Sequence, residues 1–353
     1  MVRHVLITGG GGFIGSHVAE YYADRDTSVT VMDNLSREES YTECQSFDSI
    51  TTYNWNHLQS EYPEIEFVKG DLRDAELVEE LADGCDGIVH TGGQVAVTVS
   101  LADPRTDFEA NALGTFNVLE AARKSSTDTA VVFASTNKVY GSNVNEIPVR
   151  ETESQYWYDH AEFEAGVPES LSIDGCTHTP YGTSKLAADL YVQDYNQRNE
   201  VNAAVFRMGC IYGPRQFGTE DQGWIAHFAI SALRDDPITI YGNGKQVRDV
   251  LYVTDLVRAY DAFLQAPSER SGVYNIGGGP GHTTSLLEFL TLLEDELGSD
   301  IDISFEEWRE GDQYVYVSDI SRARDRLNWD PKIDFETGVR RLLDWLKSQQ
   351  FVD

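Results

Sequence analysis

Positive charge is scarce in this sequence. Its 353 residues include 27 Lys and Arg against 59 Asp and Glu, which gives a formal net charge of −32 at pH 7. Only seven of the cations are Lys, and nothing offers the basic stripe that phosphate contacts along a nucleic acid need. The same negative field opposes binding to an anionic membrane surface. We therefore expect neither a nucleic acid nor a membrane as a partner.

Cysteine and long apolar runs are scarce too. The four cysteines are scattered, with no Cys-x-x-Cys and no His pair at zinc spacing, so we expect reduced, mostly structural cysteines and no metal site. No apolar run approaches the roughly 20 residues of a membrane-spanning helix. The chain opens on a strand-like run rather than on a charged leader. Together these absences predict a cytoplasmic protein.

The acidic residues are spread along the whole chain rather than gathered in a tail. A diffuse acidic shell repels itself at low salt, a property that halophilic proteins use. We interpret the chain as halophilic, with an ordinary acidic cytosolic protein as the alternative. With 41% apolar residues, the chain still has enough hydrophobic side chains to form a core.

Short β-branched runs alternate with helical patterns in the first part of the chain. Runs bounded by helices in this way are typical of parallel strands buried on both faces. Right-handed crossovers then predict an α/β fold, a Rossmann-type doubly wound parallel sheet with a ligand crevice at the carboxyl ends of its strands. The expected strands are 5–7, 29–32, 65–68, 87–90, 130–134 and 202–207, and the expected helices are 14–24, 74–82, 106–124 and 180–198.

Beyond residue 205 the elements become shorter and turn residues more frequent. We expect a cofactor domain at 1–205 and a smaller C-terminal α/β substrate domain at 206–353, with part of 246–266 able to return to the first domain. Two long connections interrupt the first domain. For 142–179, which is rich in aromatic residues, we favour a substrate-facing or lid role. The segment 36–63 is left open between surface decoration and a subunit contact.

Glycines lie where the first expected strand runs into a helix. Gly9, Gly12 and Gly15 permit a tight turn and a close approach of backbone N–H groups to a pyrophosphate, and the helix N-terminus adds positive potential. Asp33 ends the second strand, where a carboxylate can accept hydrogen bonds from an adenosine ribose and favours NAD over its 2′-phosphorylated form. After the third strand, Asp71 and Leu72 are open between an adenine contact and a simple turn.

A phenol and an ammonium lie four residues apart in Tyr181 and Lys185, on one face of an expected helix. The cation favours the phenolate, so Tyr181 can take a proton from a hydroxyl while the carbon gives hydride to a nicotinamide. Thr136 adds a hydroxyl at the carboxyl end of the fifth strand. A third strand end carries His90 and Gln94, with small residues between them. Each motif alone is also found as a surface pair or a strand-end turn.

With these motifs the chain resembles the extended short-chain dehydrogenase/reductase superfamily, in particular its nucleotide-sugar epimerases and dehydratases. The resemblance covers almost the whole chain. It implies a bound NAD and a catalytic set of Thr136, Tyr181 and Lys185. It also implies cofactor contacts from the glycine turn and its surroundings: Gly9, Gly12, Phe13, Ile14, Gly15, Asp33, Asn34, Asp71, Leu72, Gln94, Asn111, Tyr181 and Lys185.

The second half carries two arginine segments that look like those of the same family. By resemblance, Arg248 and Arg309 would hold the diphosphate of a nucleotide sugar, because guanidinium matches phosphate oxygens in a bidentate way. Ion pairing at the surface is the alternative for either arginine in so acidic a protein. The remaining residues expected to bind substrate are Gln94, Asn137, Lys138 and Gln216.

The residues after Thr136 discriminate between reactions. Dehydratases of this family carry Asp-Glu there, whereas this chain has Asn137 and Lys138, which cannot supply paired carboxylate chemistry. Segments 135–141, 212–224 and 242–250 are similar to the CDP-tyvelose (CDP-paratose) 2-epimerases, which implies inversion at C2 through a transient ketosugar. A UDP-glucose 4-epimerase-like enzyme is the alternative, and a dehydratase or a non-catalytic NAD-binding protein is less favoured. The family also implies a homodimer through the 106–124 and 180–198 helices.

Overall fold

The computed structural model describes residues 2–36, 52–309 and 311–349. Most of the polar segment 36–63 therefore lies outside the described residues, and its described end forms helix α2 (Tyr53–Glu61). The chain folds into two compact units. Unit 1 comprises Met1–Ser135, Thr183–Phe206 and Val257–Val273, and unit 2 comprises Thr136–Gly182, Arg207–Leu256 and Tyr274–Asp353. The assignment of a cofactor domain to 1–205 and a substrate domain to 206–353 stays a prediction.

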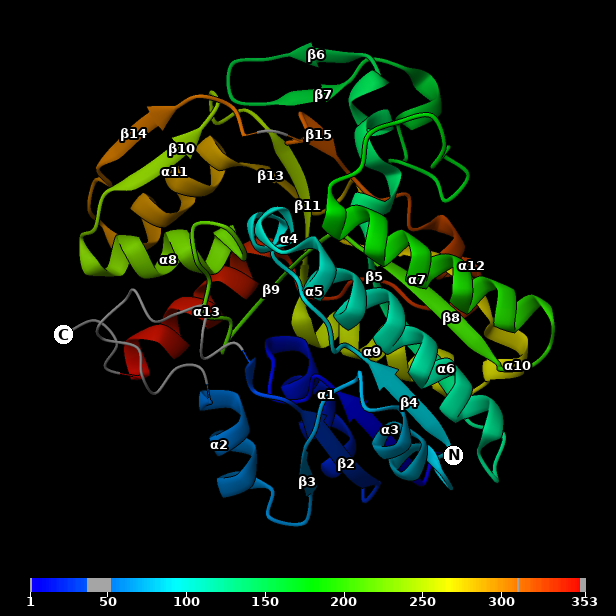
Figure 1. The fold of residues 1–353 in the computed structure, drawn as a ribbon. Helices are drawn as coiled ribbons and strands as arrows, with labels where there is room; N and C mark the ends of the chain where they lie inside the picture. The colour runs from blue at the N-terminus through cyan, green and yellow to red at the C-terminus, as the bar shows by residue number, and fades with distance from the viewer. Residues whose placement is uncertain (1, 37–51, 310, 350–353) are drawn as a thin grey trace. The chain divides into compact units, whose positions relative to one another are not determined.

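A seven-stranded sheet, most of whose residues belong to unit 1, has the order β12-β8-β5-β4-β1-β2-β3 (Figure 1). Strands β1 to β5 pair in parallel, and the order reverses between β1 and β4. This switch point puts a crevice at the carboxyl ends of those two strands. The expected Rossmann-type sheet is confirmed. The six expected runs overlap β1 (His4–Thr8), β2 (Ser28–Asp33), β3 (Glu66–Lys69), β4 (Gly87–His90), β5 (Ala130–Thr136) and β8 (Ala203–Met208), and the seventh strand, β12 (Gly272–Ile276), was not expected.

Helices pack on this sheet through apolar faces. Val118 and Leu119 of one helix and Val192 of another are fully or almost fully buried in one cluster with Leu6 and Phe133 of the strands. Burial of such side chains contributes on the order of 1.5–3 kcal/mol each. The helices with most of their residues in unit 1 are α1 (Phe13–Ala23), α2, α3 (Ala75–Ala82), α4 (Val97–Ala102), α5 (Pro104–Phe108), α6 (Gly114–Lys124), α7 (Pro180–Gln197), α9 (Val253–Leu264) and α10 (Pro267–Arg270).

The expected helix 106–124 contains a π-helical turn. This turn, η2 (Glu109–Leu113), separates α5 from α6. The inserted turn lies around Asn111, whose side chain donates hydrogen bonds to Asp107 and Ser184. Single π turns inside helices are frequent at functional sites because they redirect a side chain.

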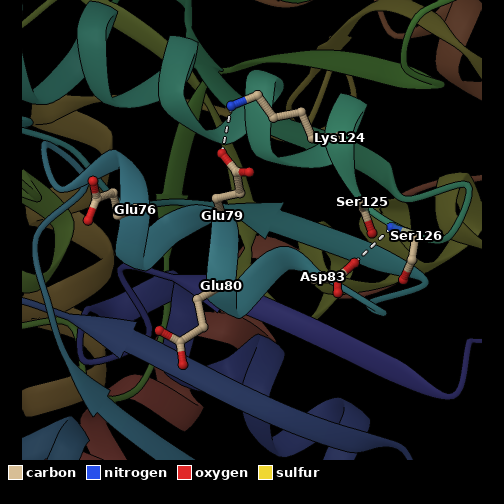
Figure 2. Close-up of a pocket in the computed structure, with 7 residues that line it drawn as sticks. All are labelled: Glu76, Glu79, Glu80, Asp83, Lys124, Ser125 and Ser126. Atoms are coloured by element: carbon tan, nitrogen blue, oxygen red, sulfur yellow. Dashed lines mark hydrogen bonds and ion pairs between the residues drawn. The ribbon is translucent and has the colours of Figure 1, made fainter.

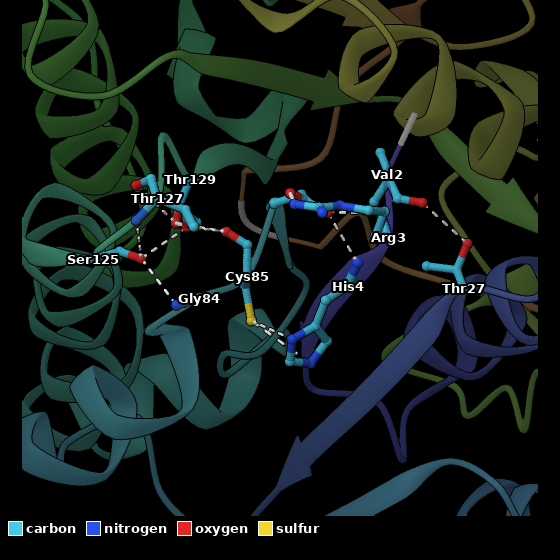
Figure 3. Close-up of polar contacts among 10 residues, drawn as sticks. Val2, Arg3, His4, Thr27, Gly84, Cys85, Ser125, Thr127 and Thr129 are labelled. Carbon is cyan, nitrogen blue, oxygen red and sulfur yellow. Dashed lines mark hydrogen bonds and ion pairs between the residues drawn. The ribbon is translucent and has the colours of Figure 1, made fainter.

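Polar contacts fasten the opposite, amino-terminal edge of the sheet (Figure 3). The Asp86 carboxylate accepts hydrogen bonds from the backbone N–H groups of Arg3 and His4, at 2.7 and 3.1 Å. The hydroxyls of Thr127 and Thr129 donate to the carbonyl of Cys85 at 2.8 and 2.7 Å. Cys85 itself is fully buried, which raises the pKa of its thiol to about 12. This cysteine is therefore an inert packing residue.

Unit 2 is built around a four-stranded sheet and a second core. Strand β11 (Val247–Tyr252) pairs with β9 (Cys210–Tyr212) and β15 (Val315–Tyr316) in parallel and with β13 (Thr283–Ser285) antiparallel. Phe228, Phe289 and Leu342 are buried together in its core. Its other elements are β10 (Ile238–Tyr241), β14 (Ile303–Glu306), α8 (Trp224–Arg234), α11 (Leu286–Leu297), α12 (Ser321–Leu327) and α13 (Phe335–Ser348).

The aromatic-rich connection 142–179 also belongs to unit 2. It contains most of the 3₁₀ segment η3 (Asn137–Glu146), the antiparallel hairpin of β6 (Val149–Glu151) and β7 (Tyr156–Tyr158), and the short η4 (Ala161–Phe163). Tyr158 is buried, and its hydroxyl donates to the carbonyl of Val315. The connection is thus an ordered part of this unit, and its lid role stays a prediction. No helix within the described ranges is long and apolar enough to cross a membrane.

Candidate active site

The glycine turn after β1 is packed so closely that only glycine fits. Gly9 has a φ of +72°, in the left-handed region that glycine favours. A Cβ on Gly15 would lie 2.3 Å from the carbonyl oxygen of Gly9, and one on Gly10 would lie 2.4 Å from Val31. Gly12 caps α1 without a side-chain hydrogen bond, so the N–H groups of the first helical turn remain available to an anion. This cradle fits a pyrophosphate.

Asp33 lies beside this turn at the end of β2. Its carboxylate accepts hydrogen bonds from the backbone N–H groups of Gly11 at 3.0 Å and Leu35 at 2.8 Å. These bonds hold the carboxylate at the rim of the cradle. A carboxylate in this position accepts hydrogen bonds from ribose hydroxyls and repels a 2′-phosphate, so the residues present fit NAD.

Asp71 connects the ends of β2 and β3. Its carboxylate accepts hydrogen bonds from Asn34 at 3.0 Å and from two nitrogens of Arg73 at 2.9 and 2.7 Å. Hydrogen bonding from Arg73 holds the pKa of Asp71 well below its usual range. The adjacent Leu72 is buried, within reach of Gly92 and Gly114. Both residues therefore support the cradle, and their contact with an adenine stays a prediction.

Lys185 is buried in α7 with 5% of its surface exposed. Its ammonium lies 4.3 Å from the centroid of the Phe133 ring. Burial lowers the pKa of Lys185 to about 8, while the charges of Asp107 and Asp189 act in the opposite direction. Asp189 is held by the Ser135 hydroxyl at 2.9 Å. The sequence analysis missed these two carboxylates, although the spacing of four residues between Lys185 and Asp189 was a usable signal.

Two buried carbonyl oxygens near the end of β4 receive no hydrogen bond within the described part of the chain. One is Oδ1 of Asn111, whose amide nitrogen donates to Asp107 and Ser184 at 3.1 Å each. The other is Oε1 of Gln94. Gly93 lies against Asn111, because a Cβ there would be 2.5 Å from this oxygen. A buried acceptor without a donor is costly, so both atoms fit a ligand that donates hydrogen bonds, such as a carboxamide.

His90 occupies the same strand end but has a structural role. Its ring nitrogens contact the hydroxyls of Thr8 at 2.7 Å and Thr115 at 2.9 Å. Complete burial and the nearby Lys185 lower the pKa of His90 to about 3. The ring is therefore neutral at physiological pH and connects β1, β4 and α6.

The other expected catalytic groups lie in unit 2. Thr136 ends β5 and caps η3, and its hydroxyl oxygen accepts a hydrogen bond from the backbone N–H of Lys138 at 3.3 Å. Tyr181 is the second residue of α7, is 9% exposed, and precedes Lys185 by about one helical turn. The expected spacing of phenol and ammonium along one helix is therefore present.

Three of the expected substrate residues converge on segment 311–313. Arg248 donates to the Asp312 carboxylate at 2.6 Å and to the carbonyl of Gln313 at 2.7 Å. The Lys138 ammonium donates to the carbonyl of Gly311 at 3.4 Å, and the Asn137 amide to Oε1 of Gln313 at 3.3 Å. Burial, followed by the charge of Arg248, lowers the pKa of Lys138 to about 8.

Gln313 is a residue that the sequence analysis missed. It is 2% exposed, and its Nε2 donates no hydrogen bond within the described ranges. No local pattern marks it, because its neighbour Asn137 is 176 residues away in the chain.

Arg309 and Gln216 have other partners. Arg309 forms ion pairs with Glu220 at 2.8 Å and Asp221 at 3.6 Å, and its guanidinium lies over the Tyr241 ring. The Gln216 amide donates to the carbonyl of Ile211 at 3.0 Å. Arg309 thus has the ion pairs that the sequence analysis gave as its alternative.

An open hollow on the surface of unit 1 is lined mostly by acidic side chains and lies apart from the glycine turn (Figure 2). It is lined by Glu76, Glu79, Glu80, Asp83, Lys124, Ser125 and Ser126. Lys124 pairs with Glu79 at 2.6 Å, and Asp83 accepts from the N–H of Ser126 at 2.7 Å. Asp83 and Ser126 shortly precede β4 and β5, so they lie at the amino-terminal edge, opposite the glycine turn. In the chain as far as it is described, no three His, Cys, Asp or Glu side chains are grouped to hold a metal ion.

Comparison with known proteins gives a consistent result. The family described as NAD dependent epimerase/dehydratase matches residues 5–277. A CDP-paratose 2-epimerase from Salmonella typhi is 39% identical, covering 98% of this chain and 99% of its own length. A putative UDP-glucose 4-epimerase from Methanocaldococcus jannaschii is 32% identical, covering 98% of each chain. The structure of a Thermus thermophilus UDP-glucose 4-epimerase with NAD matches with a TM-score of 0.75 and 30% identity, covering 98% of this chain and 99% of that one.

Proposed function

Because the chain belongs to the NAD-dependent epimerase/dehydratase family, we propose that it inverts one carbon of a nucleotide-diphosphate sugar by transient oxidation. The proposed position is C2 of a CDP-linked sugar, as the name of the Salmonella typhi relative indicates. The observation that carries the proposal is the pair of Tyr181 and Lys185, one turn apart in α7 and both buried. Asn137 and Lys138 after Thr136 favour epimerisation over dehydration.

In this proposal the residues of the chain move one proton. Tyr181 takes the proton of a sugar hydroxyl, and the Lys185 ammonium favours the phenolate that does so. The Thr136 hydroxyl orients the same sugar oxygen by a hydrogen bond. NAD, when bound, accepts the hydride of the carbon and returns it. Tyr181 then gives the proton back after the ketosugar has presented its other face.

The cofactor is assigned to the glycine turn and its neighbours. Gly9, Gly12 and Gly15 would carry the pyrophosphate, with the N–H groups of Phe13 and Ile14, and Asp33 would hold the adenosine ribose. The side-chain oxygens of Gln94 and Asn111, which receive no hydrogen bond from the described residues, suit the amide donors of a carboxamide. Contacts from Asn34, Asp71 and Leu72 belong to the same proposal.

The substrate diphosphate is assigned to the cations of unit 2. Arg248 and Lys138 lie on segment 311–313 with Asn137, where two cations offset the acidic shell. Arg309 and Gln216 complete the proposed set. Inversion at C4 of a UDP sugar is the second candidate, because the Methanocaldococcus jannaschii relative has that name.

A turnover screen tests the proposal. The NAD-loaded protein is incubated at molar salt with CDP-, UDP-, dTDP- and GDP-sugars in separate reactions, and the products are analysed by NMR. We expect inversion at one ring carbon, without solvent deuterium in the sugar when the reaction runs in heavy water. A 4-keto-6-deoxy product, or retention of NAD without turnover of any sugar, would contradict the proposal.

We also propose that the protein is a cytoplasmic homodimer. Large apolar side chains are exposed on unit 1 on consecutive helical elements and on α7: Val99, Leu101, Phe108, Leu113, Leu190 and Tyr191. Apolar side chains gathered on neighbouring elements are typical of an interface between proteins. A second copy of the chain covers them in this proposal.

A further inference from the structure

A tight turn in unit 2 carries two carboxylates at its tip. Thr219 and Gln222 exchange two backbone hydrogen bonds, at 2.8 and 3.1 Å, and leave Glu220 and Asp221 between them. Glycines flank the turn on both sides. Gly223 has a φ of +76°, and a Cβ on Gly218 would lie 2.4 Å from the carbonyl oxygen of Gly223. The sequence therefore builds a narrow loop, 218–223, with glycine at both ends, where the backbone conformation of Gly223 and the close packing of Gly218 favour it.

Both carboxylates of this loop face Arg309. The guanidinium pairs with Glu220 at 2.8 Å and with Asp221 at 3.6 Å, and it also donates to the backbone carbonyl of Glu220 at 2.9 Å. The Tyr241 hydroxyl donates to the Glu220 carboxylate, and its ring lies 3.8 Å below the guanidinium. Hydrogen bonding from Tyr241 lowers the pKa of Glu220, so this carboxylate is charged at neutral pH.

These contacts occupy the face of Arg309 that an anionic ligand needs. A guanidinium presents its donors in a fixed planar fork that matches an anionic group in a bidentate way, and here both terminal nitrogens are engaged by loop 218–223. We propose that loop 218–223 is an acidic latch: Glu220 and Asp221 hold Arg309 in the free protein, and the diphosphate of the substrate displaces them. This inference depends on the proposed function, because it takes Arg309 as a diphosphate ligand.

The exposure of the two arginine pairs supports displacement at Arg309. The side chains of Arg309, Glu220 and Asp221 are 33, 51 and 44% exposed. Exposed ion pairs are individually weak, so a doubly charged diphosphate can replace them. Arg248 and Asp312 are only 14 and 21% exposed, and Arg248 is also bonded to two backbone carbonyls. Arg248 is therefore held in place by its neighbours. Arg309 is the arginine at which the substrate diphosphate competes with the carboxylates of loop 218–223.

The test measures nucleoside diphosphate binding in latch variants. Titration calorimetry compares CDP, UDP, dTDP and GDP on the NAD-loaded wild type, on Glu220→Gln and on Glu220→Gln with Asp221→Asn. We expect the dissociation constant of the nucleotide that binds the wild type to fall about 2- to 5-fold per carboxylate removed, with kcat unchanged and KM lowered. Glu151→Gln is the matched control, because it removes one exposed charge that pairs with Lys245 in the same unit.

The Arg309→Gln variant distinguishes the latch from a general effect of net charge on nucleotide binding. Arg309→Gln should weaken binding, and Glu220→Gln added to it should give no further gain. The latch would be overturned if Glu220→Gln raised the nucleotide affinity of Arg309→Gln as much as that of the wild type, or if Glu151→Gln raised it equally. Net charge would then explain the effect. Unchanged binding in both latch variants, with wild-type thermal midpoints, would also overturn it and leave the proposed function standing. Wild-type protein that binds no nucleoside diphosphate and turns over no sugar would remove both proposals.

Discussion

The ammonium of Lys185 lies over the ring of Phe133, 4.3 Å from its centroid, in a position that solvent hardly reaches. The aromatic face stabilises the cation, while burial favours the neutral amine. Burial outweighs the charges of Asp107 and Asp189 and lowers the pKa of Lys185 to about 8. A group that supports the Tyr181 phenolate by its charge therefore titrates close to physiological pH.

An alkaline loss of activity follows from that pKa. Below about pH 8 Lys185 is protonated and favours the phenolate, whereas above it the charge is lost. We expect kcat/KM to decline as pH rises through about 8. Phe133→Leu removes the ring and should move the decline to lower pH. Lys138→Gln should leave it in place, and a flat profile to clearly alkaline pH would contradict the role of Lys185.

Tyr181→Phe tests the proton transfer. The phenyl ring keeps the packing of a side chain that is 9% exposed but has no proton to exchange. General acid–base groups contribute roughly 10²- to 10⁴-fold, so turnover should fall by at least about 100-fold while bound NAD stays at the wild-type level. Cofactor content by absorbance and turnover by NMR measure the two effects. Activity close to wild type would exclude Tyr181 as the catalytic base.

Gly15→Ala tests the glycine turn. Ala normally stabilises a helix by about 1 kcal/mol relative to Gly, but here its Cβ would lie 2.3 Å from the Gly9 carbonyl oxygen. The turn must shift, and we expect NAD affinity to fall more than about tenfold. Gly281→Ala is the matched control, because a Cβ there has no atom within 4 Å. Equal NAD affinity in both variants would contradict the cradle.

A charge on the exposed apolar face tests the homodimer. Phe108 and Leu190 are 55 and 47% exposed, so Phe108→Glu and Leu190→Glu have little effect on a folded monomer. In a dimer each variant buries an unpaired charge, which costs several kcal/mol. We expect light scattering to give a dimer mass for the wild type and a monomer mass for the variants. A monomeric wild type would refute the proposal.

Salt should stabilise the protein. A net charge of −32 produces self-repulsion in the folded state, and chloride salts at molar concentration screen it over distances beyond about 3 Å. We expect the thermal midpoint to rise from low to molar potassium chloride. Equimolar potassium and sodium chloride should act alike if screening is the cause. A midpoint independent of salt would refute the halophilic interpretation.

The sequence predicts best what local patterns determine. Buried β-branched runs mark the strands, and the glycine turn and the spacing of Tyr181 and Lys185 follow from residues close together in the chain. Features that depend on contacts between residues far apart in the chain cannot be predicted from local sequence patterns. The π turn at Asn111 accompanies a hydrogen bond to Ser184, 73 residues away, and Arg309 faces a loop 89 residues away. The contact between Asn137 and Gln313, 176 residues apart, has the same origin.

Helix α7 determines the separation of Tyr181 and Lys185 along its axis. Its first residues, up to Gly182, group with unit 2, and those from Thr183 onward group with unit 1. Tyr181 and Lys185 nevertheless share one unbroken run of backbone hydrogen bonds, and a helix rises about 1.5 Å per residue. Helices form in roughly a microsecond, far faster than domains dock. The separation of the phenol and the ammonium is therefore set by local helix geometry.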